Sequence, residues 1–547
     1  MRTIFILVML LSPITVIAQH SHSAKDQTTN LTPGLGRVEH RVTTSSSEAQ
    51  KFFNQGLACI YGFNHEEAVR SFRRAAELDP SMAMAYWGVA LSLGSNYNLQ
   101  ADAPQLKEAF QNLQTALKLA PKSSESDRAY IDALAKRYSE DTSVDRQKLA
   151  MDYRNAMRLL MTRFPDDMDV ATLYAESIMN LRPWKLWSLD GKPAEDTLEI
   201  VSVLENVLKR DPNHLGANHY YIHAVEASKN PERASMSADR LGKLAPSSGH
   251  LVHMPSHIYI RTGDYDAAAI ANQEAIRADR RYIAARGADG VYPMMYYNHN
   301  IHFLASANAM KGRYRDAMSS ASELESSVEP HLKVMPMLEM FALYPTVTLV
   351  RFHRWNEILK LAEPAPELKV SRAFWNFARG MSYAGSGQTS SAELSLNNFR
   401  TLVKEIPSDT PFGNNTAADI LRVAENTLAA KIEFVKGNRD SAFKQFRLAA
   451  EAEDKVAYNE PPDWDLPVRE LFGATLLLSG DYVEAEKVFR AELNKHRRNG
   501  RALFGLAQSL KGQKKFSDAR NVERDFSKAW STADTKLNMV ELSGITR

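Results

Sequence analysis

Histidine is the residue type whose placement in this sequence best supports chemistry. Eight of the 15 histidines fall between positions 214 and 302 of the 547-residue chain. Among them, His219 and His223 form a pair four residues apart, and His253 and His257 form a second such pair 34 residues later. Residues four apart share one face of a helix, so each pair can present two imidazole nitrogens to one ligand.

The two pairs stand in the same register of a longer repeat. Each pair follows a proline, Pro212 or Pro246, by seven and eleven residues. The larger offset counted from Pro165 gives Glu176, which places a carboxylate at the matching position one unit earlier. Equal offsets from equivalent loop residues predict equivalent faces of neighbouring helices.

A further helix continues the series. His250 precedes Gly263 by thirteen residues, and His299 precedes Gly312 by the same number, with His302 three residues later. We therefore expect one stripe across four successive units to hold seven histidines and two carboxylates: His219, His223, His250, His253, His257, His299, His302, Glu176 and Glu226.

The elements that must position this stripe repeat along the chain as helix, turn, helix and closing proline. The first clear unit contains Gly56, Ala68, Phe72, Ala75 and Pro80. Small residues allow paired helices to approach closely, and proline ends the second helix. This pattern resembles the tetratricopeptide repeat family, and it recurs to about residue 530.

The resemblance implies an all-α fold, a right-handed α-solenoid of about ten helix-turn-helix units. It also implies a concave groove, lined by the first helix of each unit, that binds a peptide, a protein or a small-molecule ligand. The histidine stripe would then face this groove. The resemblance does not imply a metal, which rests on the register of the histidines alone.

Imidazole and carboxylate groups at this spacing favour a divalent transition metal: Zn, Cu, Fe, Ni or Mn. A dinuclear site fits the number of candidate ligands, as does one ion with further histidines around it. Glu176 and Glu226 are candidates to orient these histidines or to act as a general base. A metal-dependent hydrolase or oxidase is compatible with this site, although no catalytic motif indicates one.

Other interpretations of the stripe remain open at this stage. The histidines could bind a phosphate or carboxylate without metal, which would strengthen as the pH falls below ~6.5, whereas metal binding would weaken. They could also be polar contacts in a scaffold that binds a partner protein, or serve metal storage or delivery. The same groove has two further sets of candidate ligand contacts, Trp184 with Trp187 and Arg469 with Glu470, for which packing in the core and a local helix start are the alternatives.

Composition excludes other functions. A net charge of +2 with 24% charged residues provides no field that would attract nucleic acid or an anionic membrane. No later run reaches the ~20 apolar residues of a membrane span.

The apolar N-terminus predicts a signal peptide and hence an exported, soluble protein, periplasmic or secreted. The expected segments are a signal peptide (1–18), a disordered leader (19–46), N-terminal repeats (47–165), central histidine-rich repeats (166–330), C-terminal repeats (331–530) and a tail (531–547).

Overall fold

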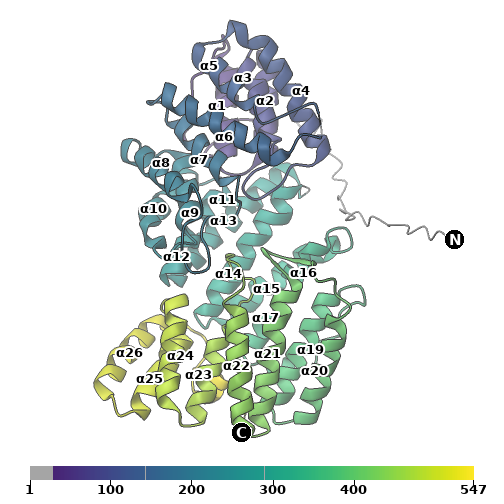
Figure 1. Ribbon diagram of the computed structural model, residues 1–547, viewed down its shortest axis with the longest axis vertical. Coiled ribbons are helices and arrows are strands. Elements are labelled where there is room, and N and C mark those ends of the chain that lie inside the picture. Colours follow the sequence, from purple (N-terminus) through teal and green to yellow (C-terminus); the bar gives the residue numbers. More distant parts are fainter. Residues whose placement is uncertain (1–28, 142, 289, 547) are drawn as a thin grey trace, which may run out of the picture.

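The computed structural model describes residues 29–141, 143–288 and 290–546. The predicted signal peptide, and the leader before residue 29, lie outside these residues. The described chain is an α-solenoid of antiparallel helix pairs, as the repeat pattern predicts (Figure 1). Among the described residues, no helix is long and apolar enough to cross a bilayer.

The helices follow one another in hairpins joined by short turns. The first part of the solenoid contains α1 (Ser47–Tyr61), α2 (His65–Leu78), α3 (Ala83–Ser92), α4 (Ala103–Leu119), η2 (Ala120–Lys122), α5 (Glu125–Leu134), α6 (Arg146–Arg163), α7 (Met168–Met179), α8 (Thr197–Arg210), α9 (Leu215–Val225), η3 (Pro231–Ala234), α10 (Ser235–Leu244), α11 (Gly249–His253), α12 (Pro255–Thr262) and α13 (Tyr265–Arg286).

The second part begins with a turn of π-helix that runs directly into α14. It contains η4 (Tyr292–Tyr297), α14 (Asn298–Met310), α15 (Tyr314–Val328), η5 (Glu329–His331), η6 (Pro336–Leu338), α16 (Glu339–Ala342), α17 (Tyr344–Arg351), α18 (Trp355–Ile358), α19 (Lys369–Gly385), α20 (Thr389–Val403), β1 (Pro411–Phe412), β2 (Asn415–Thr416), α21 (Ala417–Val435), α22 (Arg439–Glu453), α23 (Val468–Leu478), α24 (Tyr482–Lys495), α25 (Gly500–Gly512), α26 (Phe516–Ala529) and α27 (Met539–Ser543). The two short strands pair antiparallel, with Pro411 opposite Thr416.

Close approach between helices explains the small residues of the repeat. A Cβ atom added to Gly56 of α1 would lie 2.7 Å from the ring of Phe72 on α2, and one added to Gly88 of α3 would lie closer still. The ring is fully buried and fills the space between three helices. Larger residues at either glycine would force these helices apart, so the close stacking of α1, α2 and α3 depends on both glycines.

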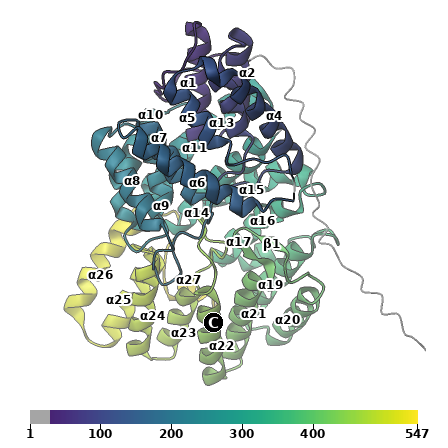
Figure 2. The same ribbon diagram turned by 45° about the horizontal axis from the view of Figure 1, so that its top comes forward.

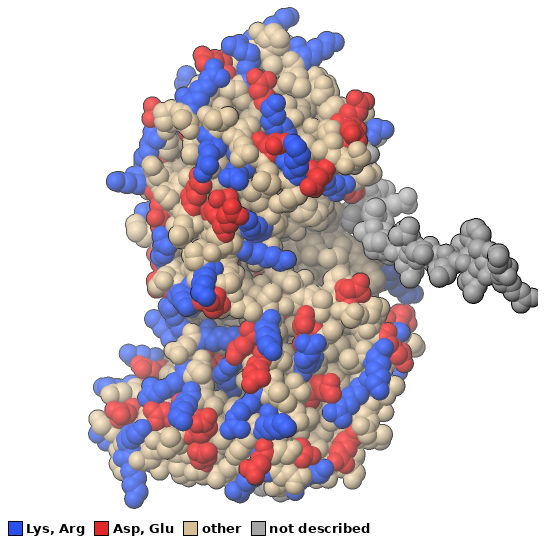
Figure 3. Space-filling view, viewed as in Figure 1, with Lys and Arg blue, Asp and Glu red and all other residues tan. Residues whose placement is uncertain are grey.

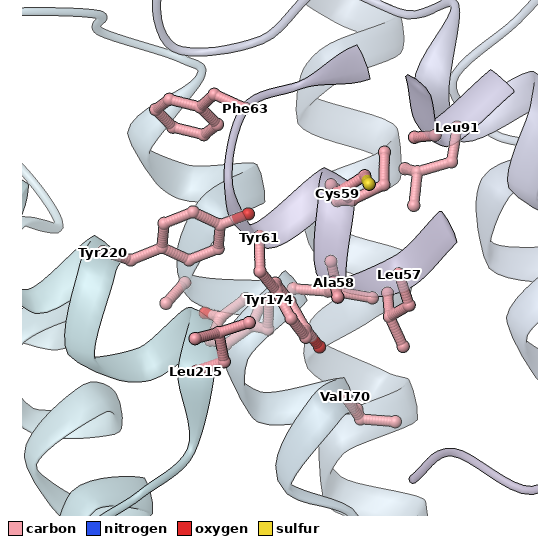
Figure 4. Packing of buried hydrophobic residues seen from close by; sticks show 14 of the residues in the cluster. Leu57, Ala58, Cys59, Tyr61, Phe63, Leu91, Val170, Tyr174, Leu215 and Tyr220 are labelled. Carbon is pink, nitrogen blue, oxygen red and sulfur yellow. The ribbon is translucent and has the colours of Figure 1, made fainter. Parts of the chain in front are cut away.

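The buried side chains form two large hydrophobic cores. One extends from α1 to η4, and the other extends from α13 to the C-terminal helices. We call the part of the molecule around the first core the first body and the part around the second core the second body. In Figure 1 the first body is the upper one and the second body the lower one, with α14 between them. Figure 4 shows part of the first core, where Tyr61 of α1 packs beside Tyr174 of α7 and Leu215 of α9.

The first body closes on itself instead of leaving an open superhelical turn. Arg286, at the end of α13, forms an ion pair with Glu67 of α2 at 2.9 Å. Beside it, Arg70 donates a hydrogen bond to the Tyr282 hydroxyl at 2.8 Å. Segments of the chain more than two hundred residues apart therefore meet.

The segment before α1 also packs against this body, so the prediction of a disordered leader is wrong for residues 29–46. The Thr29 hydroxyl donates to the buried Glu67 carboxylate at 2.5 Å, and His40 Nδ1 lies 2.8 Å from Asp169 Oδ2. The polar composition of this segment suggested disorder, but its side chains find charged partners on α2 and α7. At the other end, the Gly544 carbonyl that follows α27 accepts hydrogen bonds from Trp355 and Lys431.

Candidate metal centre

The histidines of the predicted stripe lie on four helices, α9, α11, α12 and α14, in the middle of the molecule. His219 and His223 belong to α9, His250 and His253 to α11, and His257 to α12. Pro255 is the first residue of α12, and α11 ends at His253, so two short helices stand where the repeat pattern would have one long helix. The remaining two, His299 and His302, are on α14. In both ribbon views α9, α11 and α14 lie near one another (Figures 1 and 2).

Six of these histidines form two groups of three. In the first triad, which consists of His219, His223 and His250, one ring nitrogen from each residue lies within 4.8 Å of the others. Within it, the Nε2 atoms of His219 and His250 are 3.1 Å apart. All three side chains are at most 2% exposed. Three imidazoles from two helices thus converge in the interior.

The second triad consists of His253, His257 and His299, and it meets the same 4.8 Å criterion. His253 Nε2 lies 2.9 Å from His257 Nε2 and 3.1 Å from His299 Nε2. The two triads are neighbours, because the ring centroids of His223 and His257 are 5.6 Å apart. The arrangement is therefore a pair of adjacent three-histidine groups.

Hydrogen bonds at Nδ1 fix the protonation of two rings. His219 Nδ1 lies 2.6 Å from the Tyr61 carbonyl oxygen, and His253 Nδ1 lies 2.7 Å from Asn272 Oδ1. The amide of Asn272 is itself oriented, since its nitrogen donates to Ser256 and to the Ala268 carbonyl. Backbone carbonyl and side-chain amide oxygens only accept hydrogen bonds, so the Nδ1 atoms of His219 and His253 carry the proton. In the neutral form of each ring, Nε2 therefore carries a lone pair.

The Glu226 carboxylate fixes one ring in each triad. Its Oε1 lies 2.7 Å from His223 Nδ1, and its Oε2 lies 2.5 Å from His257 Nδ1. The Tyr458 hydroxyl adds a donor to Oε2 at 3.3 Å. Although burial would raise the pKa of Glu226, His257 and His223 hold it well below its usual range, so the group is ionised. Glu226 therefore positions histidines, and both of its oxygens already accept hydrogen bonds from them.

These anchors leave two lone pairs facing each other. The Nδ1 atoms of His253 and His257 both donate outward, so when the two rings are neutral neither has a proton for the 2.9 Å contact between their Nε2 atoms. Burial, and then neighbouring imidazoles, lower the pKa of His219, His250, His253 and His299 well below the ordinary value. Burial likewise lowers the pKa of His223. An arrangement of buried lone pairs is stabilised by a bound cation.

Orphaned nitrogens occur at the first triad as well. His223 Nε2 and His250 Nδ1 are buried and have no hydrogen-bond partner among the described residues. Leaving a buried imidazole nitrogen unsatisfied costs about 1–3 kcal/mol, so a bound cation at these two atoms would remove a cost that the described side chains leave in place. Nitrogens that lack partners are available to coordinate an ion.

Aromatic rings enclose both triads, and of these rings only Trp184 was predicted as part of the site. Phe63, held at a φ of 53° in the turn after α1, packs against His219 with ring centroids 4.5 Å apart. Tyr97 lies 5.3 Å from His223, and Phe303 lies 5.0 Å from His253 by the same measure. These contacts exclude water and lower the local dielectric. The Phe63 contact joins residues about 150 positions apart, and no local sequence signal reveals it.

The prediction that the stripe faces an open groove is therefore wrong. Because the first body closes on itself, α1 and its following turn fill the space in front of α9 and α11. His219 Nδ1 consequently meets a backbone oxygen of α1 instead of solvent.

Two residues of the predicted stripe lie away from the triads. His302 belongs to neither group and packs against Phe341 and Tyr344, with ring centroids 5.5 and 4.4 Å away. Burial lowers its pKa to about 3. Glu176 accepts a hydrogen bond from Asn180, and burial raises its pKa. Neither is a ligand or a base at the triads in this arrangement.

The other predicted contacts have separate places. Trp184 covers the first triad, with its ring 5.8 Å from that of His223. Trp187 donates a hydrogen bond to the Ala224 carbonyl at 2.8 Å. Arg469 pairs with Asp454 at 2.5 Å. Glu470 is buried and accepts from Arg501 at 2.7 Å, so the pair Arg469 and Glu470 holds C-terminal helices together instead of contacting the histidine stripe.

A third cluster, unpredicted, contains His40, Asp167 and Asp169. Its polar atoms are already paired. Asp169 receives His40 Nδ1 at 2.8 Å, His214 Nε2 at 3.3 Å and the Tyr61 hydroxyl. Asp167 accepts from the Tyr130 hydroxyl and from the backbone at the start of α7. This cluster therefore joins the leader to the solenoid and, unlike the triads, leaves no lone pair unmatched.

Comparison with known proteins supports the fold. The tetratricopeptide repeat model matches residues 49–82, which span α1, α2 and the turn that follows. No curated protein matches the chain in sequence. Among solved structures, human IFIT1 bound as a dimer to m7Gppp-AAAA is 12% identical, with a TM-score of 0.32, over 90% of this chain and 92% of its own.

Yeast Tom70 is another similar structure, 14% identical with a TM-score of 0.29, and the match covers 91% of this chain and 94% of Tom70. At these values the two likenesses say nothing about the histidine triads. The family-model match shows one tetratricopeptide repeat at residues 49–82, and consecutive helix hairpins with small residues where helices meet continue the same architecture through the described chain.

Proposed function

We propose that this protein binds two transition-metal ions, one at each histidine triad. The observation that carries the proposal is the 2.9 Å contact between the Nε2 atoms of His253 and His257, both of which donate through Nδ1 to other groups. In their neutral forms the two rings present facing lone pairs, which repel each other unless a proton or a metal cation lies between them. Imidazole-only donor sets suit Zn, Cu, Fe and Ni better than Mg or Ca.

The surroundings of the triads support the same proposal. Histidines that bind metals donate their second nitrogen to a carboxylate or carbonyl, which fixes the ring and makes the ligand more basic. Four of the six rings here have such a partner: His219, His223, His253 and His257. Three protein ligands leave further positions on each ion, at which water or oxygen can bind.

An alternative function follows from the family. Tetratricopeptide repeats commonly bind peptides or proteins, and the exposed faces of this solenoid are available for a partner. The two hypotheses differ in their response to a chelator. Binding of a partner by the scaffold would be indifferent to metal removal, whereas the proposed centre would be emptied by it.

Metal content tests the proposal directly. The protein would be purified without an affinity tag, stripped with a chelator, incubated separately with Zn, Cu, Fe and Ni, desalted, and analysed by plasma mass spectrometry. We expect two ions of one metal per chain, and about one in His257→Ala. The matched control is His331→Ala, because His331 lies in η5 and outside both triads. Fewer than 0.2 ions per chain with every metal would refute the proposal.

Export remains part of the proposal, since a chain with this N-terminus would encounter metals outside the cytoplasm. Cleavage after residue 18 would be checked by N-terminal sequencing of the protein recovered from the medium or periplasm.

A further inference from the structure

Basic side chains gather at the junction between the two bodies, beside the helix α12 that also carries His257. A cavity of about 160 Å³ is lined by Lys229, Arg261, Lys495 and Arg497, and none of the described residues that line it is acidic. They come from the segment after α9, from α12 and from the end of α24. Figure 3 shows Lys and Arg side chains concentrated at the left of the waist between the two bodies.

The contact between the bodies holds this cavity in place. Gly263, which ends α12 with a φ of 79°, approaches the Arg497 carbonyl so closely that an added Cβ atom would lie 2.3 Å from that oxygen. The Tyr265 hydroxyl donates to the same carbonyl at 3.0 Å. The basic groups are therefore brought together by a tight backbone junction between parts of the chain more than two hundred residues apart.

Their charges are only partly compensated. Arg261 donates to the carbonyl oxygens of Glu226 and Ser228, both at 3.2 Å, and no described carboxylate pairs with it. Lys229 has no ion pair among the described residues, and Lys495 Nζ is 3.6 Å from Asp454 and 3.7 Å from Glu453. Arg497 pairs with Glu232 at 3.2 Å. Like charges around a small cavity attract an anion strongly.

A second, larger cavity adjoins the first and has a different character. Its volume is about 330 Å³, and Arg261 and Lys495 line both cavities. The larger cavity is also lined by carboxyl groups, among them Glu453, Glu460 and Asp465. The combined space is thus lined by basic groups without carboxyl groups at one end, and by both basic and carboxyl groups at the other.

We propose that the two cavities together form a binding site for a small organic molecule that carries a carboxylate or phosphate at one end and an amine at the other. The anionic group lies among Lys229, Arg261 and Arg497, where guanidinium groups match its oxygens in pairs. The body of the molecule extends into the larger cavity, where the amine meets the carboxyl groups. A molecule with an acid at both ends would bring no amine donor to these carboxyl groups.

A matched set of six-carbon probes tests this assignment on protein stripped of metal. Binding of 6-aminohexanoate, adipate and hexylamine would be measured by isothermal titration calorimetry at low salt. We expect 6-aminohexanoate to bind at least about tenfold more tightly than adipate or hexylamine, since only it satisfies both ends. A phosphate arm, with 6-aminohexyl phosphate, distinguishes a carboxylate from a phosphate ligand.

Variants separate this site from a general charge effect. Lys229→Gln and Arg261→Gln should each weaken 6-aminohexanoate by about tenfold. Lys229 is exposed, so its variant tests the site without disturbing the fold, and Arg439→Gln on α22 is the matched control that should leave binding unchanged. Equal binding of adipate and 6-aminohexanoate, no binding of any probe, or unchanged binding in both variants would overturn the proposal.

The same measurement separates this inference from the metal proposal. Binding by the stripped protein places the ligand among the basic groups, whatever the metal analysis shows. Binding that appears only after metal is restored would mean that the probe coordinates an ion, and it would refute the basic site while supporting the histidine centre.

Discussion

Replacing Glu226 by Gln should perturb both proposed metal sites through one buried residue. The carboxylate accepts from His223 through one oxygen and from His257 through the other. A Gln side chain of the same shape has one oxygen and one NH2 group, so it can accept from only one of the two rings. The other ring then faces a donor, and it avoids the clash by moving its proton to Nε2 and losing the lone pair that would bind the ion.

The expected loss follows from this geometry. Removing a partner of this kind costs roughly 10–100-fold in metal affinity, and blocking the ligand nitrogen outright costs more. We expect Glu226→Gln to weaken one ion by at least about 100-fold and the other by about tenfold or more. In free energy this corresponds to about 3 kcal/mol and about 1.4 kcal/mol respectively.

The assay is a competition titration against a chromophoric chelator at pH 7.5, which resolves two successive dissociation constants. Glu451→Gln, an exposed glutamate on α22, is the matched control and should bind both ions as the parent does. Circular dichroism on the metal-free proteins would show that the two variants are equally folded. If folded Glu226→Gln bound two ions with parental affinity, the carboxylate would not position the histidines, and the reasoning would be refuted.

Three further predictions follow from individual contacts. Asn272→Ala removes the acceptor of His253 Nδ1 alone, so it should weaken the second ion by about tenfold and leave the first unchanged in the same titration; loss at both sites would contradict the assignment. His302→Phe should retain two ions in metal analysis, because His302 packs among aromatic rings, and a loss of one ion would make it a ligand after all. Burial lowers the pKa of Lys431 to about 7, against ~10.4 in an unfolded chain. Between these two pH values the unfolded state binds more protons than the folded state does, so the folded state becomes more stable as the pH rises. Denaturant unfolding should show this gain, amounting to a few kcal/mol at most, in the parent but not in Lys431→Met; an equal gain in the variant would assign it to another group.

The sequence was sufficient to predict the elements and the local pairing of the ligands. The close packing of Gly56 against Phe72 is a short-range feature of one hairpin and its neighbour, and it recurs through the chain. The spacing of His219 and His223, and the equal offset of His253 and His257, depend only on helical periodicity and on equal repeat lengths. These are local properties, and they predicted the helices on which six converging rings lie.

What the sequence did not predict depends on the closure of the solenoid. The Tyr61 carbonyl that anchors His219 is 158 residues away, and its approach requires the whole first body to turn back on itself. The same closure buries the stripe and brings Phe63 over the first triad. Glu176 has the correct register in its own unit, yet its carboxylate meets Asn180, because equal register does not guarantee equal distance between successive helices.

Residues outside the histidine stripe were misjudged for a related reason. Arg469 and Glu470 occupy the predicted helix start, but their partners, Asp454 and Arg501, belong to neighbouring hairpins and pair them as structural contacts. A charged residue at the start of a groove-lining helix can therefore contact a ligand or form an ion pair between repeats. The sequence alone does not distinguish these two roles.

Anomalous diffraction from crystals grown with the bound metal tests the central claim most directly. Data on either side of the absorption edge locate each ion without reference to the protein density. The account predicts two peaks per chain, each ~2.0–2.1 Å from ring nitrogens, one among His219, His223 and His250 and the other among His253, His257 and His299. Metal-incubated crystals with no peak at either triad, and with His253 and His257 still in direct contact, would contradict it.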